Sequence, residues 1–132
     1  MSQIVSVSRE IAGKTLKLEI GKVASQADSA VWVQYGESVV LVTVVVGRDN
    51  PSLGYFPLSV EYIERLYASG KIKGSRWVKR EGRPSDDAVL TGRLVDRAIR
   101  PLFDKNFNRE VQVIMTELAY DGEAELDIAS FI

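Results

Sequence analysis

The chain has 132 residues, of which 45% are hydrophobic and 27% are charged, and its formal net charge is -1. This length suits one globular domain, and no apolar run approaches the ~20 residues that a membrane-spanning helix needs. Because the chain has no cysteine and no histidine, it cannot form disulfides, thiolate metal sites, Ser-His-Asp triads or histidine-ligated metal sites. We expect a cytoplasmic protein with no membrane partner.

The first half of the sequence predicts antiparallel strands separated by short turns. Apolar and polar residues alternate or give way to β-branched runs, which predicts strands over 4–9, 15–20, 30–35, 38–46 and 56–63. Gly36-Glu37 lies between two of these strands and predicts a hairpin. Residues 39–46 are nearly all apolar and β-branched, so this strand is expected to be central and buried on both faces.

The segment 68–84 contains three glycines and shows no periodicity, which predicts a long exposed loop. Loops of this length in compact domains are usually functional or disordered. The segment 85–99 predicts a helix, because Ser85 is a favourable N-cap and Pro101 follows its end.

At about 100° per residue, this helix separates two kinds of side chain. One broad side is expected to be apolar and a narrow side basic. The apolar side carries Leu90, Leu94, Val95, Ala98 and Ile99, and the basic side carries Arg93, Arg97 and Arg100.

The last third predicts a strand over 111–119 and then an acidic turn, with a further helix from Glu125. The acidic residues there lack the spacing of a calcium loop and are expected to form a solvated turn rather than a metal site. They are Asp121, Glu123, Glu125 and Asp127. The chain ends in the apolar stretch 128–132, which leads us to expect a piece of a longer protein.

Charge is distributed unevenly along the chain. From Arg65 to Arg109 there are twelve Lys or Arg and five Asp or Glu, whereas the remainder has five and thirteen. Cations interleaved with Trp77 are typical of a groove for single-stranded nucleic acid, in which cations neutralise phosphates and the ring stacks on bases. The alternative for each helix arginine is an ion pair with a carboxylate of the same chain.

Several runs of residues together resemble the bacterial polynucleotide phosphorylases. The runs are Lys71 to Gly74, Lys79 to Ser85 and Arg93 to Phe103, supported by Tyr55 to Val60 and Glu110 to Ile114. More narrowly, residues 1–132 resemble the N-terminal portion of the first of that family's two ribonuclease-PH-like domains. The resemblance implies an α+β fold of the ribonuclease-PH-like type. This is a two-layer β-α-β arrangement related to a ribosomal-protein fold, with antiparallel strands before a basic helix and the domain incomplete.

The resemblance also implies an activity for the parent protein. The family degrades single-stranded RNA from the 3′ end by phosphorolysis in mRNA turnover, releases nucleoside diphosphates and can polymerise in reverse. It uses Mg²⁺ and inorganic phosphate, forms a homotrimer and can join other RNA-degradation proteins. Its metal-binding aspartates and phosphate-binding serine lie in a second domain. We therefore expect no catalytic or metal-binding residue in this chain, and no activity from the chain alone.

By the same resemblance, eight residues are expected to bind RNA. They are Trp77, Val78, Lys79, Arg80, Arg83, Arg93, Arg97 and Arg100. The first four match a channel loop that is usually Phe-Phe-Arg-Arg. Trp77 can still stack there, whereas Val78 cannot, and Lys79 offers a point charge in place of a planar fork.

Two other interpretations remain open at this point. The chain is a non-catalytic RNA-binding ring subunit of the exosome type, or it is a structural α/β domain whose arginines pair with internal carboxylates.

Overall fold

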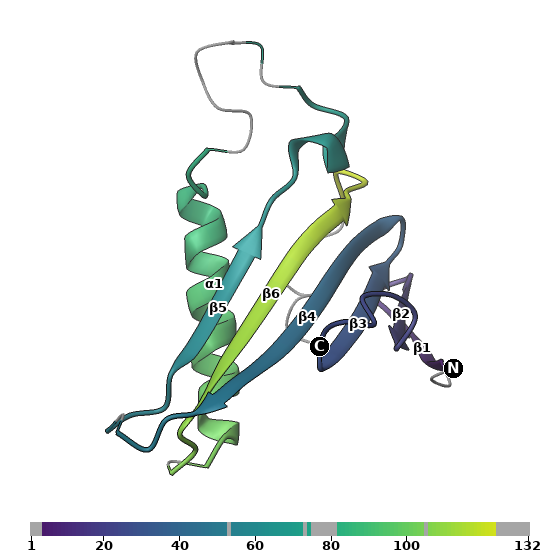
Figure 1. Ribbon diagram of the computed structural model, residues 1–132. Coiled ribbons are helices and arrows are strands. Elements are labelled where there is room, and N and C mark those ends of the chain that lie inside the picture. Colours follow the sequence, from purple (N-terminus) through teal and green to yellow (C-terminus); the bar gives the residue numbers. More distant parts are fainter. Residues whose placement is uncertain (1–3, 53, 73, 75–81, 105, 124–132) are drawn as a thin grey trace.

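The computed structural model describes residues 4–52, 54–72, 74, 82–104 and 106–123. In this part of the chain, six strands form one sheet and a 14-residue helix packs on it (Figure 1). In chain order the elements are β1 Val5–Ile11, β2 Lys14–Ile20, β3 Ser29–Tyr35, β4 Ser38–Asp49, β5 Leu58–Ile63, η1 Leu66–Ser69, α1 Asp86–Ile99, η2 Arg100–Leu102 and β6 Arg109–Ala119. The expected α+β class with two layers is confirmed.

The strand order across the sheet is β1-β2-β3-β4-β6-β5. Four neighbouring pairs are antiparallel, and the three of them within the first half of the chain were predicted to be so, but β5 pairs parallel with β6. The expectation of antiparallel pairing is therefore wrong for the strand predicted over 56–63. A parallel pair needs a crossover connection, and α1 supplies it between β5 and β6.

Two tight turns confirm the predicted N-terminal hairpins. Ala12 and Gly13 both have positive φ, 51° and 78°, as in a type I′ turn between β1 and β2. Gly36 has φ 62° in the two-residue loop that joins Tyr35 to its partner Ser38. Glycine adopts this φ without a steric cost, which explains its place at the β3–β4 turn.

The main core lies between α1 and strands β4, β6 and β5. Val40, Tyr62, Ala88, Val95 and Met115 form its buried cluster. The prediction that residues 39–46 are buried on both faces holds only at the start of β4, because Val45 is exposed. One helix layer covers one face of a sheet, so a long apolar strand need not be buried over its whole length.

The helix confirms its predicted position, but its predicted apolar side is right only for Val95 and Ile99, which pack in the core. Leu90 and Leu94 are 61% and 50% exposed. Ala98 is exposed as well. The side that faces the sheet instead carries small or branched residues, namely Ala88, Thr91, Gly92, Val95 and Ile99. A Cβ on Gly92 would lie 3.3 Å from the carbonyl oxygen of Val60. Because the helix lies so close to β5, only small side chains fit between them. The buried side of the helix is therefore not the side that carries the leucines.

Two boundaries also differ from prediction. The start of the predicted loop 68–84 overlaps η1, and the chain continues after α1 into η2, with Pro101 inside that 3₁₀ turn. Proline lacks only the N–H donor, which the first residues of a helical turn do not use. The helix expected from Glu125 lies outside the described residues.

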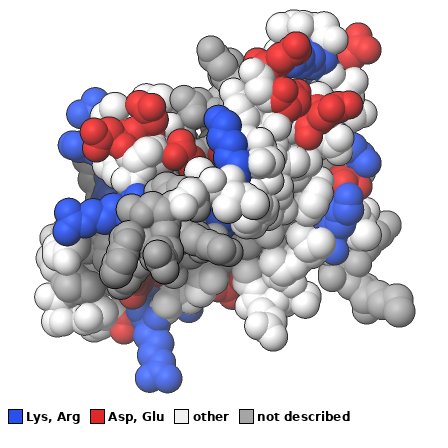
Figure 2. All heavy atoms as spheres, turned by 90° about the horizontal axis from the view of Figure 1, so that it is seen from above, with Lys and Arg blue, Asp and Glu red and all other residues white. Residues whose placement is uncertain are grey.

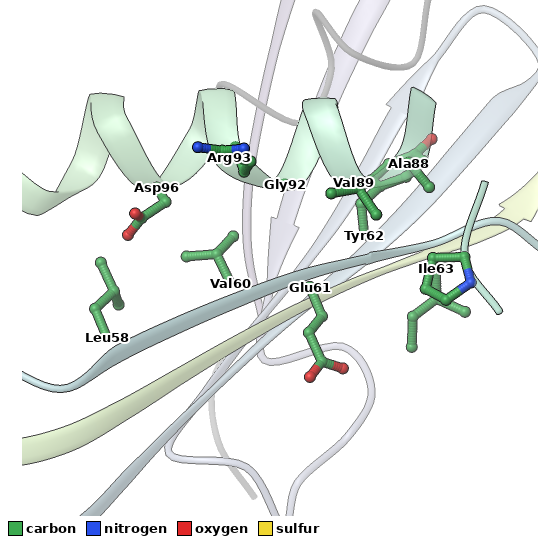
Figure 3. A pocket seen from close by; sticks show the side chains of 11 residues that line it. Leu58, Val60, Glu61, Tyr62, Ile63, Ala88, Val89, Gly92, Arg93 and Asp96 are labelled. Carbon is green, nitrogen blue, oxygen red and sulfur yellow. The ribbon is translucent and has the colours of Figure 1, made fainter. Parts of the chain in front are cut away.

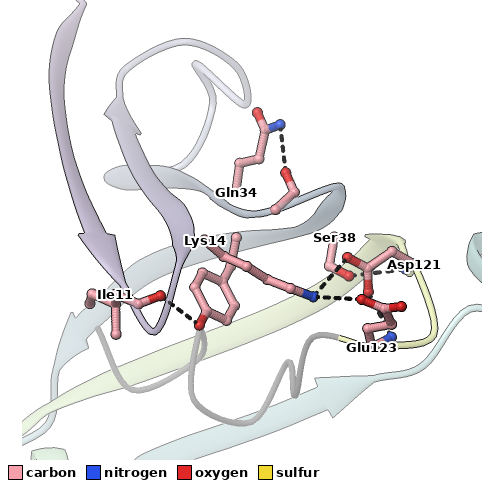
Figure 4. A network of polar contacts seen from close by, with 8 residues as sticks. Ile11, Lys14, Gln34, Ser38, Asp121 and Glu123 are labelled. Carbon is pink, nitrogen blue, oxygen red and sulfur yellow. Dashed lines mark hydrogen bonds and ion pairs between the residues drawn. The ribbon is translucent and has the colours of Figure 1, made fainter.

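Polar contacts join the N-terminal hairpin to the end of β6 (Figure 4). The Lys14 ammonium lies 3.7 Å from Asp121 Oδ2 and 3.3 Å from Glu123 Oε2. The Asp121 amide donates to Ser38 Oγ at 3.0 Å, and the Tyr35 hydroxyl donates to the Ile11 carbonyl at 3.1 Å. The prediction of a solvated turn is therefore wrong for Asp121, whose side chain is only 13% exposed.

Candidate nucleic-acid interface

The three predicted arginines follow one another at the C-terminal end of α1, with Arg93 and Arg97 inside the helix and Arg100 as its C-cap. Ser85 caps the helix, because its hydroxyl accepts a hydrogen bond from the Ala88 amide at 3.0 Å. Asp86 and Asp87 follow in the first turn, where the positive end of the helix dipole favours carboxylates. A helix that begins here sets Arg93, Arg97 and Arg100 at intervals of four and three residues.

Arg93 and Arg97 are exposed and make no hydrogen bond or ion pair with any residue that the structure describes. Both line a hollow of about 560 Å³ on the outer side of α1, together with Leu90 and Leu94. Arg93 also borders a groove of about 440 Å³ between α1 and β5 (Figure 3). Each guanidinium therefore keeps its donors available to an external anion such as phosphate.

Arg100 is arranged differently, because it is bound within the chain. Its guanidinium donates to both carboxylate oxygens of Asp96, from Nε at 3.3 Å and from Nη2 at 2.7 Å. It also donates to the carbonyls of Phe56 at 3.2 Å and Leu58 at 3.3 Å. For Arg100, the structure therefore contains the alternative given in the sequence analysis, an ion pair with a carboxylate of the same chain.

The other predicted residues lie before the helix. Arg83 is exposed in the segment that leads to the cap. Trp77, Val78, Lys79 and Arg80 lie outside the described residues. Seen from above in Figure 2, the described Lys and Arg side chains stand as separate groups among acidic and uncharged ones. On that face, the described cations do not merge into one continuous patch.

Acidic side chains that the sequence analysis did not single out lie close to this surface. In Figure 3, the Asp96 side chain points from α1 toward Leu58 of β5, whereas Glu61 points away from the helix. Glu64, which follows β5, accepts a hydrogen bond from the Ser85 hydroxyl at 2.7 Å. The i,i+4 spacing of Asp96 and Arg100 is a sequence signal for their pairing, but no local pattern connects Glu64 with Ser85.

A second glutamate lies beside Glu64. Glu117 on β6 is buried, and burial raises the pKa of its carboxyl above the ordinary value. The negative charge of Glu64 raises this pKa further, while a hydrogen bond with Tyr62 and the charge of Lys71 act in the opposite direction. The N-terminal end of α1 is thus held by Glu64, whose charge also acts on Glu117, and the exposed arginines lie further along the helix.

Among the described residues, the acidic side chains do not gather into a magnesium site. Within the described ranges, no group of three or more Asp, Glu, His or Cys side chains is placed to hold a metal ion. The described residues therefore give no basis for a metal-dependent chemical step in this chain. No helix in the same ranges combines the length and the apolar character that crossing a membrane requires.

Comparison with known proteins identifies what the chain is similar to. The profile of the family described as "3′ exoribonuclease family, domain 1" matches residues 12–132. Polyribonucleotide nucleotidyltransferases from Dictyoglomus thermophilum and Desulforamulus reducens are 56% and 52% identical to it, each over 100% of this chain. The chain spans about a fifth of the length of these relatives, 19% and 18% respectively.

Solved structures show the same fold at low sequence identity. An Archaeoglobus fulgidus exosome with RNA bound to the active site matches with a TM-score of 0.62 and 20% identity, over 98% of this chain and 47% of the other. The crystal structure of rice Rrp46 matches with a TM-score of 0.63 and 11% identity, over 88% and 50%. These likenesses confirm the expected ribonuclease-PH-like fold.

Proposed function

Because the chain belongs to the 3′ exoribonuclease family, we propose that it forms part of the RNA-facing surface of a phosphate-dependent 3′-to-5′ exoribonuclease. In this proposal residues 1–132 are the N-terminal portion of the first ribonuclease-PH-like domain of a polyribonucleotide nucleotidyltransferase. The names of the relatives at 56% and 52% identity support the activity class. The parent enzyme would release nucleoside diphosphates and run in reverse as a polymerase.

The observation that carries the proposal is the pair of exposed arginines on α1. Arg93 and Arg97 are one helical turn apart, about 6 Å along the axis, and share the outer hollow. Arginine stays charged at any working pH and grips phosphate oxygens with a planar fork. Two such groups in a row suit successive phosphates of one unpaired strand.

The remaining RNA contacts belong to the proposal on the strength of the family resemblance. They are Trp77, Val78, Lys79 and Arg80 of the loop and Arg83 before the helix. Magnesium and inorganic phosphate would be bound by other parts of the parent enzyme, and a homotrimer would bring several copies of this surface around one channel. Association with further RNA-degradation proteins and a cytoplasmic location are part of the same proposal.

Salt-dependent binding of an unstructured RNA tests the surface directly. We expect the chain to bind a fluorescent oligoadenylate, with affinity falling as salt rises by a slope of about 0.7 for each phosphate contact. Arg93→Gln and Arg97→Gln should each lower that slope by about 0.7. Arg9→Gln, which removes one exposed arginine from β1 at the far edge of the sheet, is the matched control. Equal effects from all three substitutions, or no retention of RNA at low salt, would contradict the proposal.

A non-catalytic ring subunit of the exosome type is the alternative function. The low identity of the exosome chains supports only a common fold, whereas the more similar relatives are named as nucleotidyltransferases. An assay of the complete parent protein separates the two. Release of nucleoside diphosphates from RNA with phosphate and Mg²⁺ supports the enzyme, and RNA binding without release supports the ring subunit.

A further inference from the structure

Helix α1 and its two cap residues contact the edge strand β5 and the residues that flank it at three separated points. Near its start, the Ser85 hydroxyl donates to Glu64 at 2.7 Å. In its middle, Gly92 lies so close that an added Cβ would be 3.3 Å from the Val60 carbonyl oxygen. At its end, the Arg100 guanidinium donates to the carbonyls of Phe56 and Leu58. We call these three points the helix–edge contacts.

The helix–edge contacts have similar spacing along the helix and along the strand. Seven and eight helix residues separate them, which corresponds to about 11 and 12 Å of helical rise. On the strand side, Glu64 and Phe56 each lie four residues from Val60, which corresponds to about 13 Å, and Leu58 lies two residues from it, which corresponds to about 7 Å. The helix and the strand therefore run in opposite directions with matched spacing, and Arg93 and Arg97 lie between the second and third contacts.

The last contact covers backbone at the free edge of β5. β5 is the end strand of the sheet. The Pro57 carbonyl accepts from the Val111 amide at 3.0 Å and so faces β6. Carbonyls alternate in direction along a strand, so that of Leu58 faces the free edge. The Phe56 carbonyl, just before β5, accepts from the Leu58 amide at 3.1 Å as well as from Arg100. Arg100 thus covers the Leu58 carbonyl, which also hinders pairing of this edge with another chain.

Arg100 has few donors left for any external ligand. A guanidinium has five N–H donors. Its four hydrogen bonds to Asp96, Phe56 and Leu58 use the Nε donor, both Nη2 donors and one Nη1 donor. A bidentate grip on phosphate needs two donors in parallel, so Arg100 could provide it only by breaking contacts within the chain.

We propose that Arg100 is a positioning residue, which together with Asp96 holds the C-terminal end of α1 on the edge of β5 so that Arg93 and Arg97 stay at the RNA surface. This inference rests on the proposed function of that surface. It assigns different roles to three arginines of similar sequence context. Arg93 and Arg97 contact RNA, and Arg100 holds the helix that carries them.

The substitution Asp96→Asn separates the two possible roles by the direction of its effect. If Arg100 gripped phosphate, loss of the Asp96 charge would release it and RNA would bind more tightly. If Arg100 positions α1, Asp96→Asn should weaken oligoadenylate binding several-fold, although it removes a negative charge. The salt slope should stay unchanged in Asp96→Asn and in Arg100→Gln, whereas Arg97→Gln should lower it by about 0.7.

The double variant and a lysine variant complete the test. Asp96→Asn with Arg100→Gln should bind no more weakly than Arg100→Gln alone, because both changes break one contact set. Arg100→Lys keeps the charge but cannot satisfy both carbonyls and Asp96 together, so it should also weaken binding. Tighter binding by Asp96→Asn, a slope lowered by 0.7 in Arg100→Gln, or wild-type affinity in Arg100→Lys would each overturn the inference.

The wild-type chain distinguishes this inference from the proposed function. If it does not bind oligoadenylate at all, the proposed function fails first. The positional role is then tested by hydrogen exchange of the β5 amides and by a double-mutant cycle on unfolding. Faster exchange in Arg100→Gln with coupling between positions 96 and 100 would support the contact set, and unchanged exchange with additive effects would overturn it.

Discussion

The two ends of one sheet behave differently, although both carry alternating apolar residues. At the β4–β6–β5 end, α1 covers the apolar side chains, and Met115 on β6 is 0% exposed. At the other end, every residue of β1 is exposed, including Val7 at 54%. The register of β1 with β2 is nevertheless complete over seven residue pairs.

This difference shows that alternation is enough to specify the pairing of β1, whereas burial of the β4–β6–β5 end depends on the helix that covers it. The β1–β2 hairpin forms because its turn has the twist that antiparallel strands require and because backbone pairing satisfies its polar groups. Lys14 and Tyr35 tie it to neighbouring segments through polar contacts. The covered end instead depends on close packing of buried aliphatic side chains, which loses free energy whenever volume is removed.

The sharpest test of this contrast is a matched pair of truncations. Met115→Ala should lower the free energy of unfolding by about 2–5 kcal/mol, because it leaves a cavity under α1. Val7→Ala on the exposed hairpin should change it by no more than about 0.5 kcal/mol. Urea denaturation of both variants measures the difference. If the two losses were equal, the exposed face of β1 would be as well covered as the core.

A smaller effect is expected where the covering helix begins. Ser85→Ala removes the acceptor for the Ala88 amide and the donor to Glu64. We expect a loss of about 1 kcal/mol in the free energy of unfolding, which is typical of a lost N-cap. Ser6→Ala on β1 is the control, because that serine is exposed on the hairpin. A loss in the control as large as in Ser85→Ala would mean that the cap does not support the covered end.

Much of this fold could be predicted from local sequence signals. Ser85 followed by two aspartates predicted the start of α1, and Gly36 predicted a hairpin, because both signals depend on the backbone geometry of a few neighbouring residues. The parallel pairing of β5 with β6 could not be predicted in this way. It joins segments about fifty residues apart, and nothing local in residues 58–63 records which partner lies beside them.

The candidate site likewise has features that local sequence signals predict and features that they do not. The arginine spacing on α1 was evident from the sequence, and Arg93 and Arg97 are exposed as a phosphate-binding pair must be. Only part of the internal contacts of Arg100 could be predicted from the sequence. Its pairing with Asp96 follows from i,i+4 spacing, whereas the carbonyls of Phe56 and Leu58 are 44 and 42 residues away. The contributions of Trp77, Val78, Lys79 and Arg80 stay predictions, since they lie outside the described residues.

The smallest expected effect concerns Glu117, a buried carboxylate of the covered end whose pKa is raised. Because burial and the charge of Glu64 raise the pKa of Glu117 above 4.5, the folded chain holds this proton more tightly than the unfolded chain. The stability that this proton contributes is therefore full below pH 4.5 and is lost as pH rises through the raised pKa.

Glu117→Gln keeps a polar group beside Tyr62 but cannot ionise. It should be more stable than the wild type near pH 7, with the gain shrinking toward pH 4. Urea denaturation at several pH values measures this gain, and Glu10→Gln on the exposed hairpin controls for the loss of one negative charge. A gain that did not depend on pH would show that ionisation of Glu117 does not limit the stability of the covered end.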